Sequence, residues 1–209
     1  MDACARSTTI MAQRDRIDEG IAVVNDELMS MLTDIDGCLG LSLLVDRSTG
    51  RCIATSSWDS RESMRASNER LQPIRQRLLD MMGGDSLEVE EWEIAILHRD
   101  HESPDTACAR VTWARPPAGQ LDTAVDAFKA NVMPMLQEQT GFCSASMLIN
   151  RETGMLCGTA SFDSMSSLEG SREFSAQQRA MMAERVGIEF VDVIECELAV
   201  HHLRVPELV

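Results

Sequence analysis

The chain has 209 residues, of which 44% are hydrophobic and 25% are charged, which is typical of one large or two small globular domains. Its formal net charge of −15 would repel phosphate backbones and anionic lipids, so we expect no nucleic-acid partner and no membrane partner. No apolar run approaches the roughly 18 residues of a bilayer-spanning helix, and the first residues carry no secretory-signal pattern. The seven cysteines form no CxxC pair, so we expect a cytoplasmic protein with reduced thiols.

The dominant feature of the sequence is an internal repeat. Residues 3–98 match residues 107–202 without a gap, at a constant offset of 104. The most recognisable shared segments are a turn, DRSTG at 46–50 and NRETG at 150–154, and an aromatic-Asp-Ser step, WDS at 58–60 and FDS at 162–164. The repeat predicts two units of one fold, residues 1–103 and 104–209.

The elements of the first unit can be read in chain order. Alternation and β-branched residues predict a strand over 4–11, and apolar residues at helical spacing predict a helix over 14–33. Two strands, 38–46 and 51–58, flank a tight turn in which Gly50 adopts a backbone angle that other residues resist. A helix capped by Asp59 and Ser60 then runs to about Met82, and residues 86–98 form the last strand.

The order of elements is therefore βαββαβ, twice. With right-handed crossovers it predicts a ferredoxin-like, four-stranded antiparallel sheet with both helices on one face. We expect the two bare sheet faces to be buried on each other. The predicted fold is thus α+β, with two tandem ferredoxin-like units forming an intrachain pseudo-dimeric α/β barrel.

Strand alternation separates two faces of each predicted sheet. One face is apolar, and we expect it beneath the helices; it carries Leu39, Leu41, Leu43, Val45, Trp92, Ile94 and Ile96. The other face is polar and identical in both copies; it carries Arg6, Thr8, Ser42, Thr55, Ser57, Glu91 and Glu93. Two interpretations of the polar face stay open. It either meets its own copy across a pseudo-two-fold axis, with arginine–glutamate pairs, or it lines a ligand cavity between the sheets.

The βαββαβ order and the aromatic-Asp-Ser steps resemble the antibiotic biosynthesis monooxygenase-like group of dimeric α/β-barrel proteins, over essentially the whole chain. The group includes cofactor-independent oxygenases of aromatic polyketides, heme-degrading enzymes and proteins of no known activity. The resemblance implies a pocket between sheet and helices within each unit. The heme-degrading members use an Asn on the first strand and a His on the second helix. Both are missing here, so heme degradation is disfavoured.

Aromatic and basic residues supply candidates for substrate binding. Trp58 and Trp92 are candidate walls for a ring, although a tryptophan at a strand exit more often caps the core. Arg6 and Arg110 are candidate polar anchors. Because these arginines are expected on the barrel face and not beneath the helices, they cannot all serve one pocket with the tryptophans.

His98 and His202 match between the copies and are the candidate catalytic residues, since histidine acts as a general base near neutral pH. The alternative is a pair of surface residues at strand ends. No metal-ligand spacing and no nucleotide motif is present, so we expect no metal and no cofactor. We predict a monomer or homodimer that binds a small hydrophobic or aromatic molecule, as a cofactor-independent monooxygenase of an aromatic or polycyclic substrate. The alternative is a non-catalytic binding or stress-responsive barrel.

Overall fold

The computed structural model describes residues 3–203 and 205–208. Its strands are hydrogen-bonded in the order β1-β3-β2-β8-β5-β7-β6-β4, and this order closes on itself as a barrel. Helices and strands follow each other as predicted in both repeats, which confirms the α+β class and the pseudo-dimeric α/β barrel. No helix within the described ranges is long and apolar enough to cross a membrane.

The chain forms two compact units that do not coincide with the two sequence repeats. One unit comprises residues up to Glu93 together with Glu197–Val205, and the other comprises Ile94–Cys196 and the last residues from Pro206. The long last strand of each repeat therefore begins in one unit and ends in the other.

The sheet of the first unit is antiparallel. β1 (Cys4–Met11) lies between β3 (Arg51–Trp58) and the first part of β4 (Leu87–Arg99). β2 (Cys38–Asp46) pairs with β3, and the last part of β8 (Glu189–Leu203) pairs with the other edge of β2.

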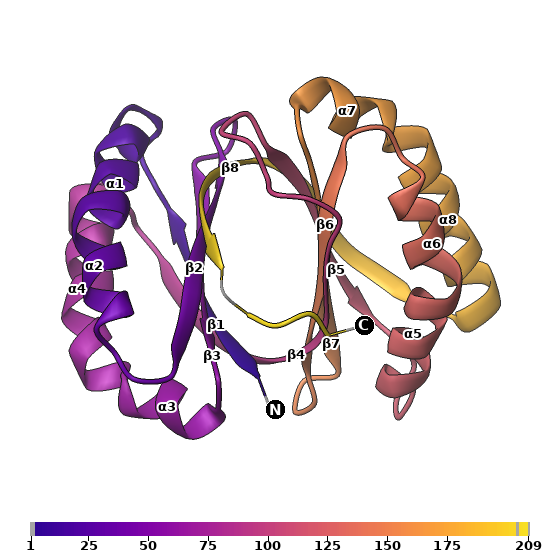
Figure 1. The fold of residues 1–209 in the computed structure, drawn as a ribbon, viewed down its shortest axis with the longest axis horizontal. Coiled ribbons are helices and arrows are strands. Elements are labelled where there is room, and N and C mark those ends of the chain that lie inside the picture. The colour runs from indigo at the N-terminus through magenta and orange to yellow at the C-terminus, as the bar shows by residue number, and fades with distance from the viewer. Residues whose placement is uncertain (1–2, 204, 209) are drawn as a thin grey trace. The chain divides into compact units, whose positions relative to one another are not determined.

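Helices cover one face of this sheet (Figure 1). They are, in chain order, a 3-10 turn η1 (Arg14–Arg16), α1 (Ile17–Val23), a π-helical turn η2 (Val24–Leu28), α2 (Met29–Thr33), α3 (Arg61–Ala66) and α4 (Asn68–Met81). Ser60 caps α3 as predicted, since its hydroxyl accepts a hydrogen bond from the backbone N–H of Ser63. The second predicted helix is divided at Ser67.

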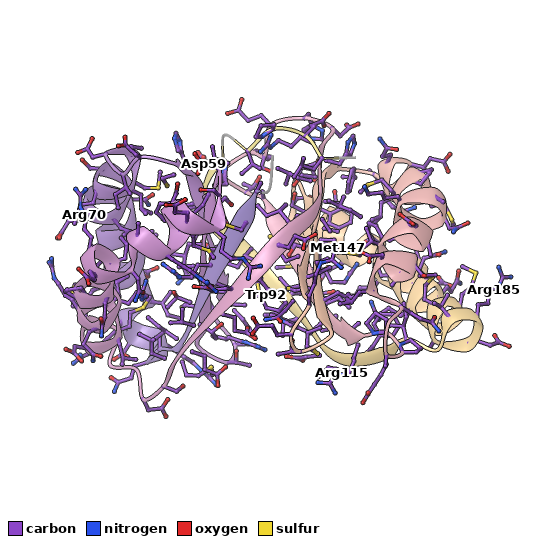
Figure 2. All side chains as sticks on the ribbon, turned by 90° about the horizontal axis from the view of Figure 1, so that it is seen from below. Asp59, Arg70, Trp92, Arg115, Met147 and Arg185 are labelled. Atoms are coloured by element: carbon purple, nitrogen blue, oxygen red, sulfur yellow. The ribbon has the colours of Figure 1, made fainter. Side chains whose placement is uncertain are left out.

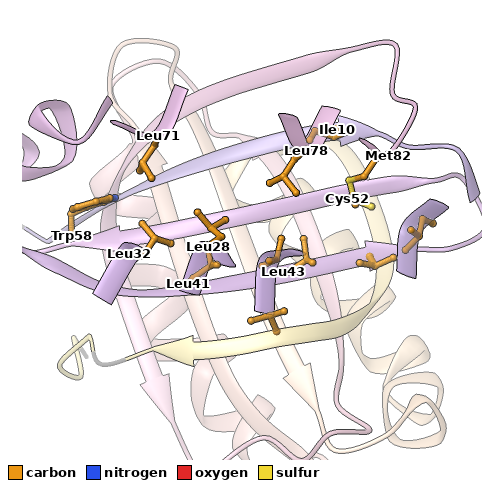
Figure 3. Close-up of a cluster of buried hydrophobic side chains, with 14 of the residues drawn as sticks. Ile10, Leu28, Leu32, Leu41, Leu43, Cys52, Trp58, Leu71, Leu78 and Met82 are labelled. Carbon is orange, nitrogen blue, oxygen red and sulfur yellow. The ribbon is translucent and has the colours of Figure 1, made fainter. Parts of the chain in front are cut away.

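The core of the first unit lies between the helices and the sheet. Figure 3 shows leucines of η2, α2 and α4 pointing toward the strands, where they meet Leu41, Leu43 and Trp58. Leu41 and Leu43 are each 2% exposed. Burying a side chain of this size contributes roughly 1.5–3 kcal/mol, and the prediction that both leucines lie beneath the helices is confirmed.

The second unit repeats this plan. Its strands are β5 (Cys108–Arg115), β6 (Phe142–Asn150) and β7 (Met155–Phe162). Its helical segments are α5 (Leu121–Ala127), a π-helical turn η3 (Phe128–Val132), α6 (Met133–Gln137), α7 (Met165–Gly170) and α8 (Arg172–Val186). The π-helical turn falls at the same place in both copies, so it is a property of the repeat, and such turns are frequent at functional sites.

Candidate functional site

The two repeat arginines lie beneath the helices, so the prediction that they lie on the opposite face of the sheet is wrong. Arg110 extends from β5, and its Nη2 donates to the backbone carbonyl of Leu168 at 2.9 Å. Nη1 donates to the hydroxyls of Ser171 at 2.8 Å and Ser175 at 2.5 Å. Nε and Nη2 donate to Glu195 Oε1 at 3.3 and 2.8 Å. All five N–H groups of this guanidinium therefore have partners inside the protein, which makes its burial tolerable.

Arg6 occupies the same position in the first unit and has fewer partners. Its Nη1 donates to Ser67 Oγ at 3.3 Å, and its Nη2 donates to Glu91 Oε1 at 3.0 Å. Arg65 also binds Glu91, at 3.2 Å. The predicted arginine–glutamate pairs thus exist, but each lies within one unit. Both interpretations of the polar face are therefore wrong for these arginines and glutamates. They form neither an interface between the copies nor the lining of a ligand cavity between two sheets.

An apolar cavity of about 110 Å³ lies beside Arg110, between the sheet and the helices of the second unit. Its wall comes from strands β5, β6, β7 and β8 and from the helical segments α5, η3, α6 and α8. Three of the chain's five phenylalanines, Phe128, Phe174 and Phe190, line it. The cavity is therefore a space with an aromatic wall and a small polar region around Arg110.

Two polar side chains of α8 also line the cavity and have unused hydrogen-bonding groups. The Oε1 atom of Gln178 is buried and accepts no hydrogen bond from the residues that the structure describes. Arg179 makes no hydrogen bond or ion pair within the described ranges. Burial, together with the positive charge of Arg110, lowers the pKa of Arg179 below its ordinary value. These are the groups available to a molecule inside the cavity.

The corresponding space in the first unit is mostly filled. The cavity beside Arg6 has a volume of about 40 Å³. Bulkier or apolar side chains stand at matching positions: Ile10 for Ala114, Ala54 for Gly158, Leu71 for Ser175 and Ile74 for Gln178. A Cβ atom added at Gly158 would meet no atom within 4 Å, so the cavity extends to the backbone of β7.

The two candidate tryptophans do not line either cavity. Trp58 is fully buried in the core of the first unit, and its Nε1 donates to Ser56 Oγ at 3.0 Å. Trp92 extends from β4 (Figure 2), and its Nε1 donates to Ser7 Oγ at 2.9 Å. Because Ser7 and Arg6 point to opposite faces of β1, Trp92 lies on the face away from the helices. The prediction that Trp92 lies beneath the helices is therefore wrong.

The two candidate histidines also lie away from the cavity of Arg110. His98 stacks on Phe142 with ring centroids 6.4 Å apart, and its Nε2 lies 2.9 Å from the amide nitrogen of Gln137. His202 lines a separate cavity of about 40 Å³ in the first unit, next to Met29 and Cys38. No group of three or more His, Cys, Asp and Glu residues able to hold a metal gathers among the described residues.

Sequence reasoning missed Gln178, Arg179 and the three phenylalanines of the cavity. A signal for most of them exists in the repeat, at positions where the copies differ. Phe128, Phe174, Phe190 and Gln178 stand where the first copy has Val24, Arg70, Ser86 and Ile74. Only Arg179 is shared, with Arg75 as its counterpart.

No family model matches the chain. Among solved structures, a protein of Lactobacillus acidophilus named as a candidate monooxygenase has a TM-score of 0.72 at 7% identity, covering 98% of this chain and 97% of that chain. An anthrone oxidase-like protein has a TM-score of 0.65 at 16% identity, covering 96% and 92%. A Listeria monocytogenes ferredoxin-fold protein related to antibiotic biosynthesis monooxygenases has a TM-score of 0.56 at 9% identity, covering 95% of each chain. These likenesses show the fold, which is the one that the sequence resemblance predicted.

Two relatives from Mycobacterium tuberculosis are much more similar in sequence. Rv2557 is 50% identical over 205 residues, which cover 98% of this chain and 91% of the relative. Rv2558 is 49% identical over 208 residues, which cover 98% and 87%. Both carry the name of uncharacterized proteins. The chain therefore belongs to the family of Rv2557 and Rv2558, and its fold is the pseudo-dimeric α/β barrel.

Proposed function

We propose that this protein binds one small molecule with a mainly apolar body per chain, in the cavity of its second unit. The proposal rests on the difference between the copies. The space beside Arg110 is unfilled and lined by phenylalanines, whereas the space beside Arg6 is mostly filled by side chains. At about 24 cal/mol per Å³ for a closed void, an empty space of about 110 Å³ that is partly open to solvent costs at most about 2–3 kcal/mol. The first copy avoids most of that cost with ordinary core side chains. A ligand that occupies the space offsets the cost in the second copy.

The volume of the cavity limits the ligand. An apolar cavity of about 150 Å³ in another protein is large enough for benzene. The space of about 110 Å³ here takes one ring or a short aliphatic chain. A polycyclic molecule would have to extend out of it. We therefore propose a single-ring ligand over the polycyclic substrate that the fold resemblance implies.

The lining of the cavity favours binding over proton abstraction. Among the described residues, the ionisable side chains that line the cavity of the second unit are Arg110 and Arg179. A guanidinium remains protonated at neutral pH, so neither side chain can act as a base. His98 and His202 lie outside it. Of the two functions that the sequence leaves open, the non-catalytic binding protein is therefore our first choice.

A second candidate is cofactor-independent oxygenation, and the fold shared with the anthrone oxidase-like protein favours it. In this cavity, the substrate would have to be acidic enough to lose its proton without a protein base. Arg179 would then stabilise the resulting anion. An oxygen electrode with anthrone as the substrate tests this candidate, and no oxygen uptake above the spontaneous rate rejects it for that substrate.

Calorimetric titration with benzyl alcohol tests the binding proposal. We expect one molecule per chain in the wild-type protein. Gly158→Val should abolish binding, because the added side chain enters space that no atom occupies within 4 Å, and it should not reduce thermal stability. Binding to Gly158→Val at wild-type strength would refute the proposal.

Two controls accompany this test. Ala54→Val makes the matching change in the first unit and should leave binding unchanged, because that cavity is already small. The double variant His98→Ala and His202→Ala should also bind normally, since neither ring lines the cavity. Loss of binding in either control, with folding intact, would place the ligand elsewhere.

A further inference from the structure

One positive charge is in excess at the polar end of the cavity in the second unit. Arg110 and Arg172 both bind Glu195, with nitrogen–oxygen distances of 2.8 and 2.6 Å, and Arg172 also binds Glu169 at 3.3 Å. With Arg179, three guanidinium groups thus face two carboxylates. Because all the donors of Arg110 have partners in the protein, the excess charge resides on Arg179, which lines the cavity.

The second unused group is the buried Oε1 atom of Gln178. A buried carbonyl oxygen without a donor loses its hydration and gains nothing in return. The matching residue in the first unit is Ile74, so the unpaired acceptor is present only where the cavity is open. An unpaired acceptor next to an empty apolar space leaves room for a hydrogen-bond donor, and the partly exposed guanidinium of Arg179 is available to an anion.

The aromatic wall provides the third part of the recognition. Phe128, Phe174 and Phe190 come from the π-helical turn, α8 and β8, and all three line the same space. Rings of this kind favour a planar aromatic ligand in offset or edge-on contact. The net charge of −15 does not prevent an anion from binding, because charges farther than about 8 Å away are largely screened at physiological ionic strength.

We propose that the ligand of this cavity is an aromatic carboxylate of one ring, which binds Arg179 through its carboxylate and donates a hydrogen bond to Gln178 from a ring substituent. This inference rests on the proposed binding function and adds the chemical class of the ligand. Its recognition has three parts: an anion for Arg179, a hydroxyl or N–H group for Gln178, and a ring for the phenylalanines.

The experiment compares 4-hydroxybenzoate with its neutral analogue 4-hydroxybenzyl alcohol, by calorimetric titration of the full-length protein. The wild type should bind the anion at least about tenfold more tightly, as expected for a charge-assisted hydrogen bond that is partly shielded from water. Arg179→Gln should remove this preference and leave the affinity for the alcohol within about twofold. Arg179→Lys should restore part of it, because it keeps the charge without the planar fork.

Arg75→Gln is the matched control, since Arg75 occupies the position of Arg179 in the first unit. It should leave the preference for the anion unchanged. If both probes bind and Arg179→Gln keeps the preference, or if the wild type shows none, the carboxylate proposal is wrong and the binding proposal stands. If neither probe binds the wild type, both proposals fail. If both probes bind Gly158→Val as well, they bind outside the cavity and both proposals fail.

Discussion

Replacement of Arg110 by methionine should strongly destabilise the second unit. The Arg110 side chain is 5% exposed, and its partner Glu195 is 23% exposed. Removing one member of a buried ion pair typically costs 3–5 kcal/mol, because the partner charge loses its compensation. Here Arg172 remains 2.6 Å from Glu195, which reduces this part of the cost. The hydroxyls of Ser171 and Ser175 also lose their donor, at about 1 kcal/mol each, whereas the carbonyl of Leu168 still accepts a hydrogen bond from Ser171 Oγ at 2.7 Å. We therefore expect a loss of about 3 kcal/mol.

Urea unfolding followed by far-ultraviolet circular dichroism measures this loss. With a slope of about 2 kcal/mol per molar urea, the midpoint should fall by about 1.5 M. The duplication supplies a matched variant: Arg6→Met should cost about 1 kcal/mol less, because Arg6 donates to one serine hydroxyl where Arg110 donates to two. Arg172→Met removes a side chain that is 54% exposed, and it should cost less than about 1 kcal/mol. The reasoning is wrong if Arg110→Met is no more destabilising than Arg172→Met.

Three further predictions follow from burial, charge and strand pairing. Burial raises the pKa of Glu195, but hydrogen bonds from Arg172 and Arg110 and their charges outweigh it and hold this pKa below 4.5. The stability that the carboxylate contributes is therefore complete above pH 4.5 and is lost as the pH falls through the folded-state pKa, so Glu195→Gln should flatten the acid branch of the stability curve. Burial raises the pKa of Cys4, Cys52 and Cys143 to about 11, so iodoacetamide at neutral pH should label these thiols only after unfolding, as mass spectrometry would show. Residues 1–103 alone lack the part of β8 that pairs with β2, so this fragment should self-associate or aggregate; a soluble monomer in size-exclusion chromatography would contradict this.

The order of elements was predictable because its signals are local. Alternation marked the strand at residues 4–11, Gly50 marked the turn with its φ of 86°, and Ser60 marked the start of α3. Each of these signals depends on a few neighbouring residues and on backbone preferences that the rest of the fold does not override. The closure of the barrel followed from the duplication, because two copies with bare sheet faces had to bury them.

The faces of the strands were harder to predict. Alternation shows which residues of a strand share a face, but not which face the helices cover. On β1, Arg6 and Thr8 share a face with Cys4 and Ile10, which pack in the core of the first unit. The polar pair suggests a face that is exposed or interfacial, whereas the apolar pair at its two ends indicates the core. A buried arginine with a full set of acceptors looks the same in a sequence as an exposed one.

The site was not predictable from the residues that the copies share, because shared residues and site residues have different roles here. Arg110, Ser171 and Glu195 are identical to Arg6, Ser67 and Glu91, and in both units they join the helix that follows the third strand of the repeat to the sheet. This network maintains the repeat fold, so identity between copies reports structure. In the proposed site, Gln178 and the three phenylalanines stand where the second copy differs, and Arg179 is the shared residue.

A duplicated chain allows that difference because the two cores are separate. The second unit carries Ala114 and Gly158 where the first has Ile10 and Ala54, and its empty space costs at most about 2–3 kcal/mol. That cost is a minor part of the 5–15 kcal/mol typical of folded domains, so one copy can keep an open cavity while the other remains filled. Restoring the residues of the first copy through Ala114→Ile and Gly158→Ala should therefore raise the stability of the second unit and abolish binding of the aromatic probe. A gain in stability with unchanged binding would separate the cavity from the ligand site.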